Sequence, residues 1–316
     1  MLGQPPSPHR QSLQAGLGPD TEVVVSTEAA PLRAAAARAD AVFLWDNLRS
    51  LLQDLWPDLR NLRWVHSRAA GLDNLWFSSL RDSAVTVTNS RGLYSRALAE
   101  FALGAMLFSA KKFRRMTDNQ AAPRWEWMDL EDLSGRTVGI LGGGDIGRAV
   151  ARLAKAFDMM VYATRRRPAG DADTPEIDRW FMAGQFRDMM AASDFVVATL
   201  PLTDETRGLV DATALAAMKP TAYFINIGRG ATVDEAALIR ALEKGRIAGA
   251  ALDVFTREPL PPDSPFFRLP NLLLSPHSAD HTPGWVEAGL ELFLDNFRRY
   301  RAGQPLCNVV DKRAGY

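Results

Sequence analysis

An arginine, a glutamate and a histidine lie in three short segments that are far apart in the sequence. Arg229 lies in NIGRG, Glu258 in DVFTREPLP and His277 in SPHSA. A guanidinium holds a carboxylate through its planar set of donors. An imidazole beside a carboxylate is suited to proton transfer near neutral pH. If the fold brings the three side chains together, they predict acid–base chemistry on an anionic substrate.

Each of these residues alone has an ordinary structural explanation. An arginine after a strand is usually a surface ion-pair partner, a glutamate before prolines is usually solvated, and a lone histidine is usually structural. The joint pattern is more specific, because each segment begins where an apolar run that predicts a buried strand ends. The elements that carry the segments therefore decide between a structural and a catalytic interpretation.

Six apolar runs in the second part of the chain predict a parallel sheet. They alternate with helical patterns and show no polar alternation, as strands buried on both faces require. The runs span 137–141, 160–164, 195–200, 223–227, 247–254 and 272–275. In a doubly wound sheet the carboxyl ends of the strands face the ligand crevice. We therefore expect Arg229, Glu258 and His277 to converge there.

The first part of the chain predicts a smaller parallel sheet with covering helices. Its apolar runs span 22–25, 41–45, 62–66 and 84–88. Residues 1–20 are rich in Pro, Gln and Gly and predict an unstructured leader with a poor first strand. A helix is predicted near the end of the chain. Thr282 would cap it, Pro283 would be its first residue, and Gly303 would end it. Its apolar stripe would allow the chain to return to the first domain.

A glycine-rich turn, GGGDIG, joins the first strand of the larger sheet to a helix. Gly142 permits a tight turn, Gly144 the close approach of a pyrophosphate, and Gly147 the packing of the helix on the strand. The helix start, with Asp145 and Ile146, favours an anion. Because another strand follows within about 30 residues, the context predicts dinucleotide binding rather than a turn without a ligand.

The end of the next strand indicates which dinucleotide is used. Thr164 is followed by Arg165, Arg166 and Arg167, and no carboxylate stands where NAD-binding turns carry one. Guanidinium groups are suited to a 2′-phosphate. The hypothesis is that NADPH is the preferred cofactor, with NADH as a second donor. The other interpretation is a solvated basic turn.

Together with LSGRTVGILG at 133–142 and LPLT at 200–203, these motifs resemble those of the D-isomer-specific 2-hydroxyacid dehydrogenases. Within that family the chain looks most like the glyoxylate/hydroxypyruvate reductases. The resemblance implies an α/β protein of two Rossmann-like domains, with a doubly wound parallel sheet in the cofactor domain and a smaller flavodoxin-like substrate domain. We expect a discontinuous substrate domain of residues 1–94 plus 282–316 and a dinucleotide-binding domain of residues 95–281.

The resemblance also implies roles for individual residues. His277 becomes the general acid/base, Glu258 the carboxylate that orients it, and Arg229 the group that binds the substrate carboxylate and polarises its carbonyl. Asp253 resembles the family residue that contacts the nicotinamide carboxamide. The remaining cofactor contacts expected are Thr199, Leu200, Pro201 and Ser278.

On the substrate side, residues 66–73 resemble the loop that offers backbone N–H groups to the substrate carboxylate. The family usually has Gly-Ala-Gly, whereas this chain has Ala69, Ala70 and Gly71. Alanine at position 69 restricts the backbone and narrows the approach. Trp45 and Tyr94 are candidates for the pocket wall, and for Trp45 core packing is the alternative.

The implied reaction is the reduction of glyoxylate or hydroxypyruvate to the D-2-hydroxy acid by hydride transfer from NADPH. One alternative is an NAD-dependent D-2-hydroxyacid dehydrogenase with a bulkier substrate. Another is a dinucleotide-sensing binding protein similar to the transcriptional corepressors of this family.

Composition narrows the partners. Lys+Arg and Asp+Glu both total 37, so no excess of positive charge favours nucleic acid. The longest apolar stretch, 101–110, is too short to span a bilayer, which needs about 20 helical residues. The single cysteine, Cys307, suits a reducing cytoplasm. His277, His281 and Asp280 are the available candidates for metal ligands, and without a nearby thiolate they do not favour a metal site. We expect a cytoplasmic enzyme without a metal, and the resemblance implies a homodimer.

Overall fold

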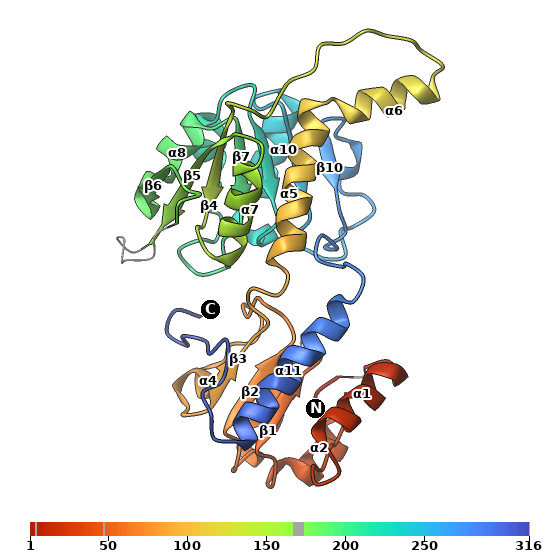
Figure 1. The fold of residues 1–316 in the computed structure, drawn as a ribbon, viewed down its shortest axis with the longest axis vertical. Helices are drawn as coiled ribbons and strands as arrows, with labels where there is room; N and C mark the ends of the chain where they lie inside the picture. Colours follow the sequence, from red (N-terminus) through yellow and green to blue (C-terminus); the bar gives the residue numbers. More distant parts are fainter. Residues whose placement is uncertain (4, 47, 167–173, 316) are drawn as a thin grey trace. The chain divides into compact units, whose positions relative to one another are not determined.

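The computed structural model describes residues 1–3, 5–46, 48–166 and 174–315, so Arg167 lies outside the described residues. The described chain divides into two compact units. Unit 1 comprises Met1–Tyr94 and Pro283–Tyr316, and unit 2 comprises Ser95–Thr282 (Figure 1).

Unit 2 contains, within the described ranges, a seven-stranded parallel sheet in the order β10-β9-β8-β7-β4-β5-β6. Its strands are β4 (Thr137–Leu141), β5 (Met160–Arg165), β6 (Arg179–Met182), β7 (Phe195–Ala198), β8 (Tyr223–Asn226), β9 (Gly249–Leu252) and β10 (Leu272–Leu274). The chain runs outward from β4 to β6 and then returns to β7, so the order reverses between β4 and β7. That reversal defines a doubly wound sheet and places its ligand crevice at the carboxyl ends of these strands.

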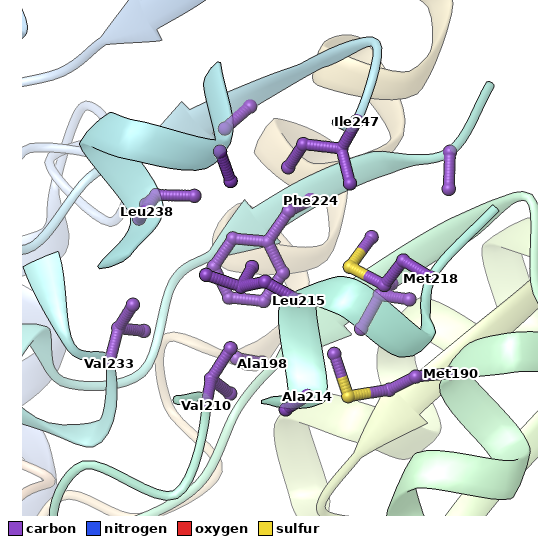
Figure 2. Close-up of a cluster of buried hydrophobic side chains, with 14 of the residues drawn as sticks. Met190, Ala198, Val210, Ala214, Leu215, Met218, Phe224, Val233, Leu238 and Ile247 are labelled. Atoms are coloured by element: carbon purple, nitrogen blue, oxygen red, sulfur yellow. The ribbon is translucent and has the colours of Figure 1, made fainter. Parts of the chain in front are cut away.

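Helices cover this sheet because its central strands are apolar on both faces. Every residue of β7 and β8 is buried. Helix α5 (Ser95–Ala110) packs on α7 (Asp145–Lys155), and α8 (Phe186–Ala192), α9 (Ala212–Ala217) and α10 (Glu235–Glu243) pack side by side. Figure 2 shows the core beneath the second group, where Phe224 of β8 lies among Leu215 of α9 and Leu238 of α10.

The six predicted strands all form, but the sequence interpretation missed β6. This strand pairs in parallel with β5, with Trp180 opposite Ala163. It lies at the edge of the sheet with Arg179 and Met182 exposed, and its apolar run, Trp180–Met182, is shorter than the about 4–8 residues typical of a buried strand.

Unit 1 contains, in its described residues, a three-stranded parallel sheet in the order β1-β2-β3. The strands are β1 (Ala41–Leu44), β2 (Trp64–Ser67) and β3 (Thr86–Thr88), and the helices beside them are α2 (Ala29–Ala36), α3 (Arg49–Leu55) and α4 (Ser78–Asp82). Leu2 forms single parallel bridges to both Leu44 and Ser26. The succession Ser26, Leu2, β1, β2, β3 therefore reproduces the 2-1-3-4-5 order of a flavodoxin-like sheet. The strand predicted at 22–25 was wrong, since only Ser26 bridges.

The predicted unstructured leader was also wrong. Residues Ser7–Leu17 form helix α1, which packs on α11 (Trp285–Arg301). Leu13 and Leu17 are four residues apart, so they lie on one helix face, and both are buried against Leu290 and Leu294. The terminal helix α11 begins two residues later than predicted, after Gly284 with φ +81°.

One further helix, α6 (Phe113–Ala121), extends from the rest of unit 2 (Figure 1). Among the described residues, no helix is both long enough and apolar enough to span a bilayer.

Candidate active site

The glycine-rich turn after β4 has the space and conformation that a pyrophosphate requires. Gly142 has φ +104°, a conformation that L side chains rarely adopt. A Cβ atom at Gly147 would collide with the Gly142 carbonyl oxygen, whereas one at Gly144 would meet no atom within 4 Å. The turn is therefore tight where the helix meets it and open where a ligand would approach.

The start of α7 adds an electrostatic contribution. Asp145 and Ile146 are its first residues, and its first backbone bond runs from Arg148 N to Gly144 O at 2.8 Å. Gly144 has no side chain to cap the helix. Such a helix start presents N–H groups and partial positive charge to an anion. The residues present therefore fit a dinucleotide diphosphate.

Neighbouring strand ends hold this turn in place. Thr164 at the end of β5 accepts hydrogen bonds from Gly142 N at its Oγ1 (3.0 Å) and from Gly143 N at its carbonyl (2.9 Å). Thr199 donates through Oγ1 to Gly142 O at 2.7 Å. The Leu200 side chain also lies against Gly142, since a Cβ there would be 3.2 Å from Leu200 Cδ2.

The two described arginines after Thr164 have different surroundings. The Arg165 guanidinium carbon lies 5.0 Å from the ring centroid of Trp180, and its Nε is buried without an acceptor among the described residues. Arg166 is exposed near Glu205. The pKa of Glu205 is lowered mainly by a hydrogen bond from Thr203, and to a smaller extent by the Arg166 charge.

His277 and Glu258 form a direct pair. The distance from His277 Nδ1 to Glu258 Oε2 is 2.7 Å, and Glu258 Oε1 accepts from Phe255 N at 2.8 Å. Both carboxylate oxygens are therefore engaged, and the carboxylate is fixed in front of the ring. His277 has φ +54°, which is uncommon outside glycine and is often found at functional sites.

Asp253 fastens the loop that carries His277. It is 1% exposed, and its Oδ1 accepts from Ser275 Oγ at 2.6 Å, Ser278 N at 2.9 Å and Ala279 N at 3.1 Å. The sequence interpretation assigned Asp253 only to the cofactor and missed this contact. The serines on both sides of His277 were the available indication.

Arg229 lies on the loop after β8, next to the loop of Glu258. Asn226 fixes this loop at both ends, since its Oδ1 accepts from Gly228 N and its Nδ2 donates to Arg229 O, each at 3.1 Å. A Cβ atom at Gly230 would collide with the Phe255 backbone, so the two loops are in direct contact.

The sheet register brings the three loops to one edge. Asn226 of β8 pairs with Leu252 of β9, which pairs with Leu274 of β10. The three strands therefore end at the same level, and neighbouring strands are about 4.8 Å apart. The fold thus places the loop of Arg229 next to the loop of Glu258, at the sheet edge where the loop of His277 also begins.

The predicted substrate loop lies after β2 in unit 1. Its carbonyls are anchored, since Ala69 O accepts from Ser90 N at 3.3 Å and Ala70 O accepts from Asn89 Nδ2 at 2.6 Å. The N–H groups of Ala69, Ala70 and Gly71 donate to no residue in the described part of the chain. They are available for an anionic ligand.

Arg68 is a notable neighbour of this loop that the sequence interpretation missed. Its guanidinium carbon lies 5.0 Å from the ring centroids of both Trp45 and Trp285, and its Nε donates to Trp45 O at 3.0 Å. Trp45 is buried in the core of unit 1, which favours its packing role.

No metal site competes with this interpretation in the described ranges. His281 lies 3.8 Å from the Asp280 carboxylate. Among the described residues, no group of three or more His, Cys, Asp or Glu side chains is placed to hold a metal ion.

Comparisons with known proteins agree with this geometry. The family described as "D-isomer specific 2-hydroxyacid dehydrogenase, NAD binding domain" matches residues 103–279. A glyoxylate reductase of Aeropyrum pernix is 38% identical over 88% of this chain and 84% of its own length. A glyoxylate/hydroxypyruvate reductase B of Pectobacterium carotovorum is 40% identical over 82% of each chain.

A solved structure is similar over nearly the whole chain. It is an NADPH-dependent glyoxylate/hydroxypyruvate reductase from Sinorhizobium meliloti in complex with NADP and sulfate. The two chains are 28% identical with a TM-score of 0.82, and the match covers 98% of this chain and 96% of the other.

The doubly wound sheet, the glycine-rich turn and the histidine–carboxylate pair define an oxidoreductase that uses a nicotinamide dinucleotide. The chain belongs to the D-isomer-specific 2-hydroxyacid dehydrogenase family, in its glyoxylate reductase branch. The family, the fold class and the enzyme class predicted from the sequence are thereby confirmed.

Proposed function

We propose that this enzyme reduces glyoxylate or hydroxypyruvate to the corresponding 2-hydroxy acid with NADPH, forming the D isomer where the product is chiral. The observation that carries the proposal is the 2.7 Å pair of His277 and Glu258 on the loops next to Arg229. The relatives named as glyoxylate and hydroxypyruvate reductases support the substrate class.

The three side chains divide the work of the reduction. Arg229 donates hydrogen bonds to the substrate carboxylate and polarises the carbonyl. Because Nδ1 of His277 is bonded to Glu258, Nε2 is the atom that delivers a proton to the carbonyl oxygen. Glu258 stabilises the imidazolium before that transfer and fixes the ring. Such acid–base assistance accelerates a reaction by about 10²–10⁴-fold.

The cofactor supplies the second component of the reaction. When bound, the reduced nicotinamide ring supplies the hydride that reaches the carbonyl carbon. The diphosphate would be held at Gly142, Gly144 and the start of α7. From the family resemblance, a second contact to the substrate carboxylate is assigned to the N–H groups of Ala69, Ala70 and Gly71, which donate to no residue in the described part of the chain.

The preference for NADPH rests on the end of β5. No acidic residue stands at positions 164–166, so no carboxylate there would repel a 2′-phosphate. Arg165 has no acidic partner among the described residues, so its charge is available to a phosphate. The Sinorhizobium meliloti relative, which is described as NADPH-dependent, supports the same preference.

The test is the decrease of absorbance at 340 nm when the purified protein is mixed with NADPH and a panel of 2-oxo acids. We expect turnover with glyoxylate or hydroxypyruvate, and a kcat/KM for NADPH above that for NADH. No turnover with any acid would favour a dinucleotide-sensing binding protein. Turnover only with NADH and bulkier acids would favour the NAD-dependent alternative.

Two expectations about the protein's setting stay predictions. A homodimer follows from the family resemblance, and a cytoplasmic location follows from the use of a single cysteine, Cys307.

A further inference from the structure

Trp180 connects the glycine-rich turn to Arg165. Its ring centroid lies 5.0 Å from the Arg165 guanidinium carbon. A Cβ atom at Gly143 would collide with Cζ3 and Cη2 of the same ring, so the edge of the indole lies directly against the turn. Trp180 thus contacts both the turn that fits the diphosphate and the arginine proposed for the 2′-phosphate.

The register of the sheet explains this contact. Trp180 pairs with Ala163, and Met182 pairs with Arg165, so Trp180 and Arg165 project from the same face at diagonal positions. The small side chain of Ala163 leaves room for the indole there. Phe181 projects from the other face and is buried in the core.

The electrostatics of Arg165 make such support useful. The guanidinium is half-buried, its Nε has no acceptor, and no described residue offers it a carboxylate. The face of an indole attracts a guanidinium, while the N–H donors in the guanidinium plane stay free for oxygen ligands. Holding the side chain in one orientation before binding reduces the entropy that binding costs.

We propose that Trp180 is a positioning residue for NADPH preference: it holds the Arg165 guanidinium beside the turn, where the 2′-phosphate binds. This inference rests on the proposed use of NADPH. Because NADH lacks the 2′-phosphate, Trp180 contributes to the use of NADPH and little to that of NADH.

The experiment compares kcat/KM for NADPH and NADH in the full-length enzyme and its variants. Trp180→Met keeps an apolar side chain without the aromatic face, and we expect kcat/KM for NADPH to fall roughly 3- to 10-fold. The value for NADH should change less than about 2-fold, because NADH has no 2′-phosphate for Arg165 to bind. Trp180→Phe, which keeps a ring, should retain most of the preference.

A double-mutant cycle with Arg165→Ala distinguishes positioning from a structural role. If Trp180 acts through Arg165, Trp180→Met has no further effect on NADPH use once Arg165 is alanine. Arg179→Gln is the matched control. Arg179 lies on the same strand with its guanidinium 4.4 Å from the Phe181 ring, on the other face, so the cofactor ratio should not change.

The outcomes separate this inference from the proposed function. A wild-type enzyme that prefers NADH overturns the proposed NADPH preference, and the inference with it. A wild-type preference for NADPH combined with equal losses for both cofactors in Trp180→Met overturns only the role of Trp180. The same holds if the loss persists in the Arg165→Ala background. If Trp180→Met does not fold, a Trp180→Phe enzyme that loses kcat/KM equally for NADPH and NADH would contradict the role.

Discussion

At the scale of single residues, the proposed chemistry depends on how His277 is held. The ring is fixed by Glu258 on one side, and its loop is fastened to Asp253 by three hydrogen bonds. The left-handed backbone at His277 is a conformation that persists only where the surroundings enforce it. A catalytic group held in this way loses little entropy when the substrate binds.

Removing the charge of Glu258 tests the pair. Glu258→Gln keeps an oxygen that accepts a hydrogen bond from the ring but no longer stabilises an imidazolium. We expect kcat to fall about 10- to 100-fold, a fraction of the full acid–base contribution. The KM of the 2-oxo acid should change little. Steady-state kinetics at saturating NADPH measures both, and an unchanged kcat would exclude Glu258 from the proton transfer.

A second prediction at the residue scale concerns the role of Asp253 in holding the His277 loop. Asp253→Ala removes the acceptor shared by Ser275, Ser278 and Ala279, so the His277 loop loses its anchor. We expect a larger loss of kcat than in Asp253→Asn, which keeps one side-chain oxygen. A variant pair with equal kcat values would mean that the loop is held by other contacts.

At the scale of elements, sequence patterns predicted the interior better than the edges. The central strands β7 and β8 are buried throughout, and a continuous apolar run is a clear indication of such a strand. β6 lies at the sheet edge, is partly exposed and has an apolar run of only three residues, so neither the strand nor the role of Trp180 was predicted. Helix α1 was not predicted because residues 1–20 are rich in Pro, Gln and Gly, a composition typical of an unstructured segment, although Leu13 and Leu17 have helical spacing.

A buried histidine in strand β2 predicts how the stability of the protein depends on pH. His66 is fully buried in β2, with Nδ1 2.7 Å from Thr88 Oγ1. Burial lowers the pKa of His66 from 6.5 to about 3. In the unfolded chain His66 is therefore protonated below about pH 6.5, whereas in the folded protein it stays neutral down to about pH 3. The contribution of His66 to stability is complete above pH 6.5 and is lost as the pH falls.

The size of this effect can be measured by chemical denaturation. At pH 5 the free energy of unfolding is lower by about 2 kcal/mol, since each pH unit below 6.5 costs about 1.4 kcal/mol. His66→Gln, which retains a polar side chain of similar size, should show a flatter decline in the free energy of unfolding between pH 7 and pH 5. Parallel profiles for the two proteins would show that His66 does not cause the decline.

At the scale of the whole molecule, two exposed tryptophans lie in the segment after α6. Trp125 is 90% exposed and Trp127 is 88% exposed, which is unusual for large apolar side chains. They are candidates for a dimer contact or for an arm that reaches the partner's active site. The structure of one chain does not specify which, because it does not show which surface a second copy covers.

The predicted homodimer can be tested through these two residues. Light scattering after size exclusion should give twice the 34.8 kDa of one chain for the wild type. The double variant Trp125→Ala, Trp127→Ala should shift toward 34.8 kDa at low concentration, since it removes a large apolar area. A monomeric wild type would refute the dimer, and a double variant that stays dimeric would place the interface elsewhere.

The wider architecture was predictable because motifs and burial patterns act locally. Short segments of the sequence are enough to predict the glycine-rich turn, the three catalytic candidates and the strands of the doubly wound sheet. The fastening of the His277 loop by Asp253, and the indole between Gly143 and Arg165, depend on pairings between distant segments. No single window of sequence contains both partners of such a pairing.

The most direct test of the central claim is the initial rate of NADPH oxidation with glyoxylate or hydroxypyruvate in His277→Ala. His281→Ala, four residues away in the same loop, is the matched control. We expect His277→Ala to lose about 10²–10⁴-fold in kcat while its affinity for NADPH stays unchanged, and His281→Ala to resemble the wild type. A His277→Ala enzyme that turns over at the wild-type rate would contradict the account.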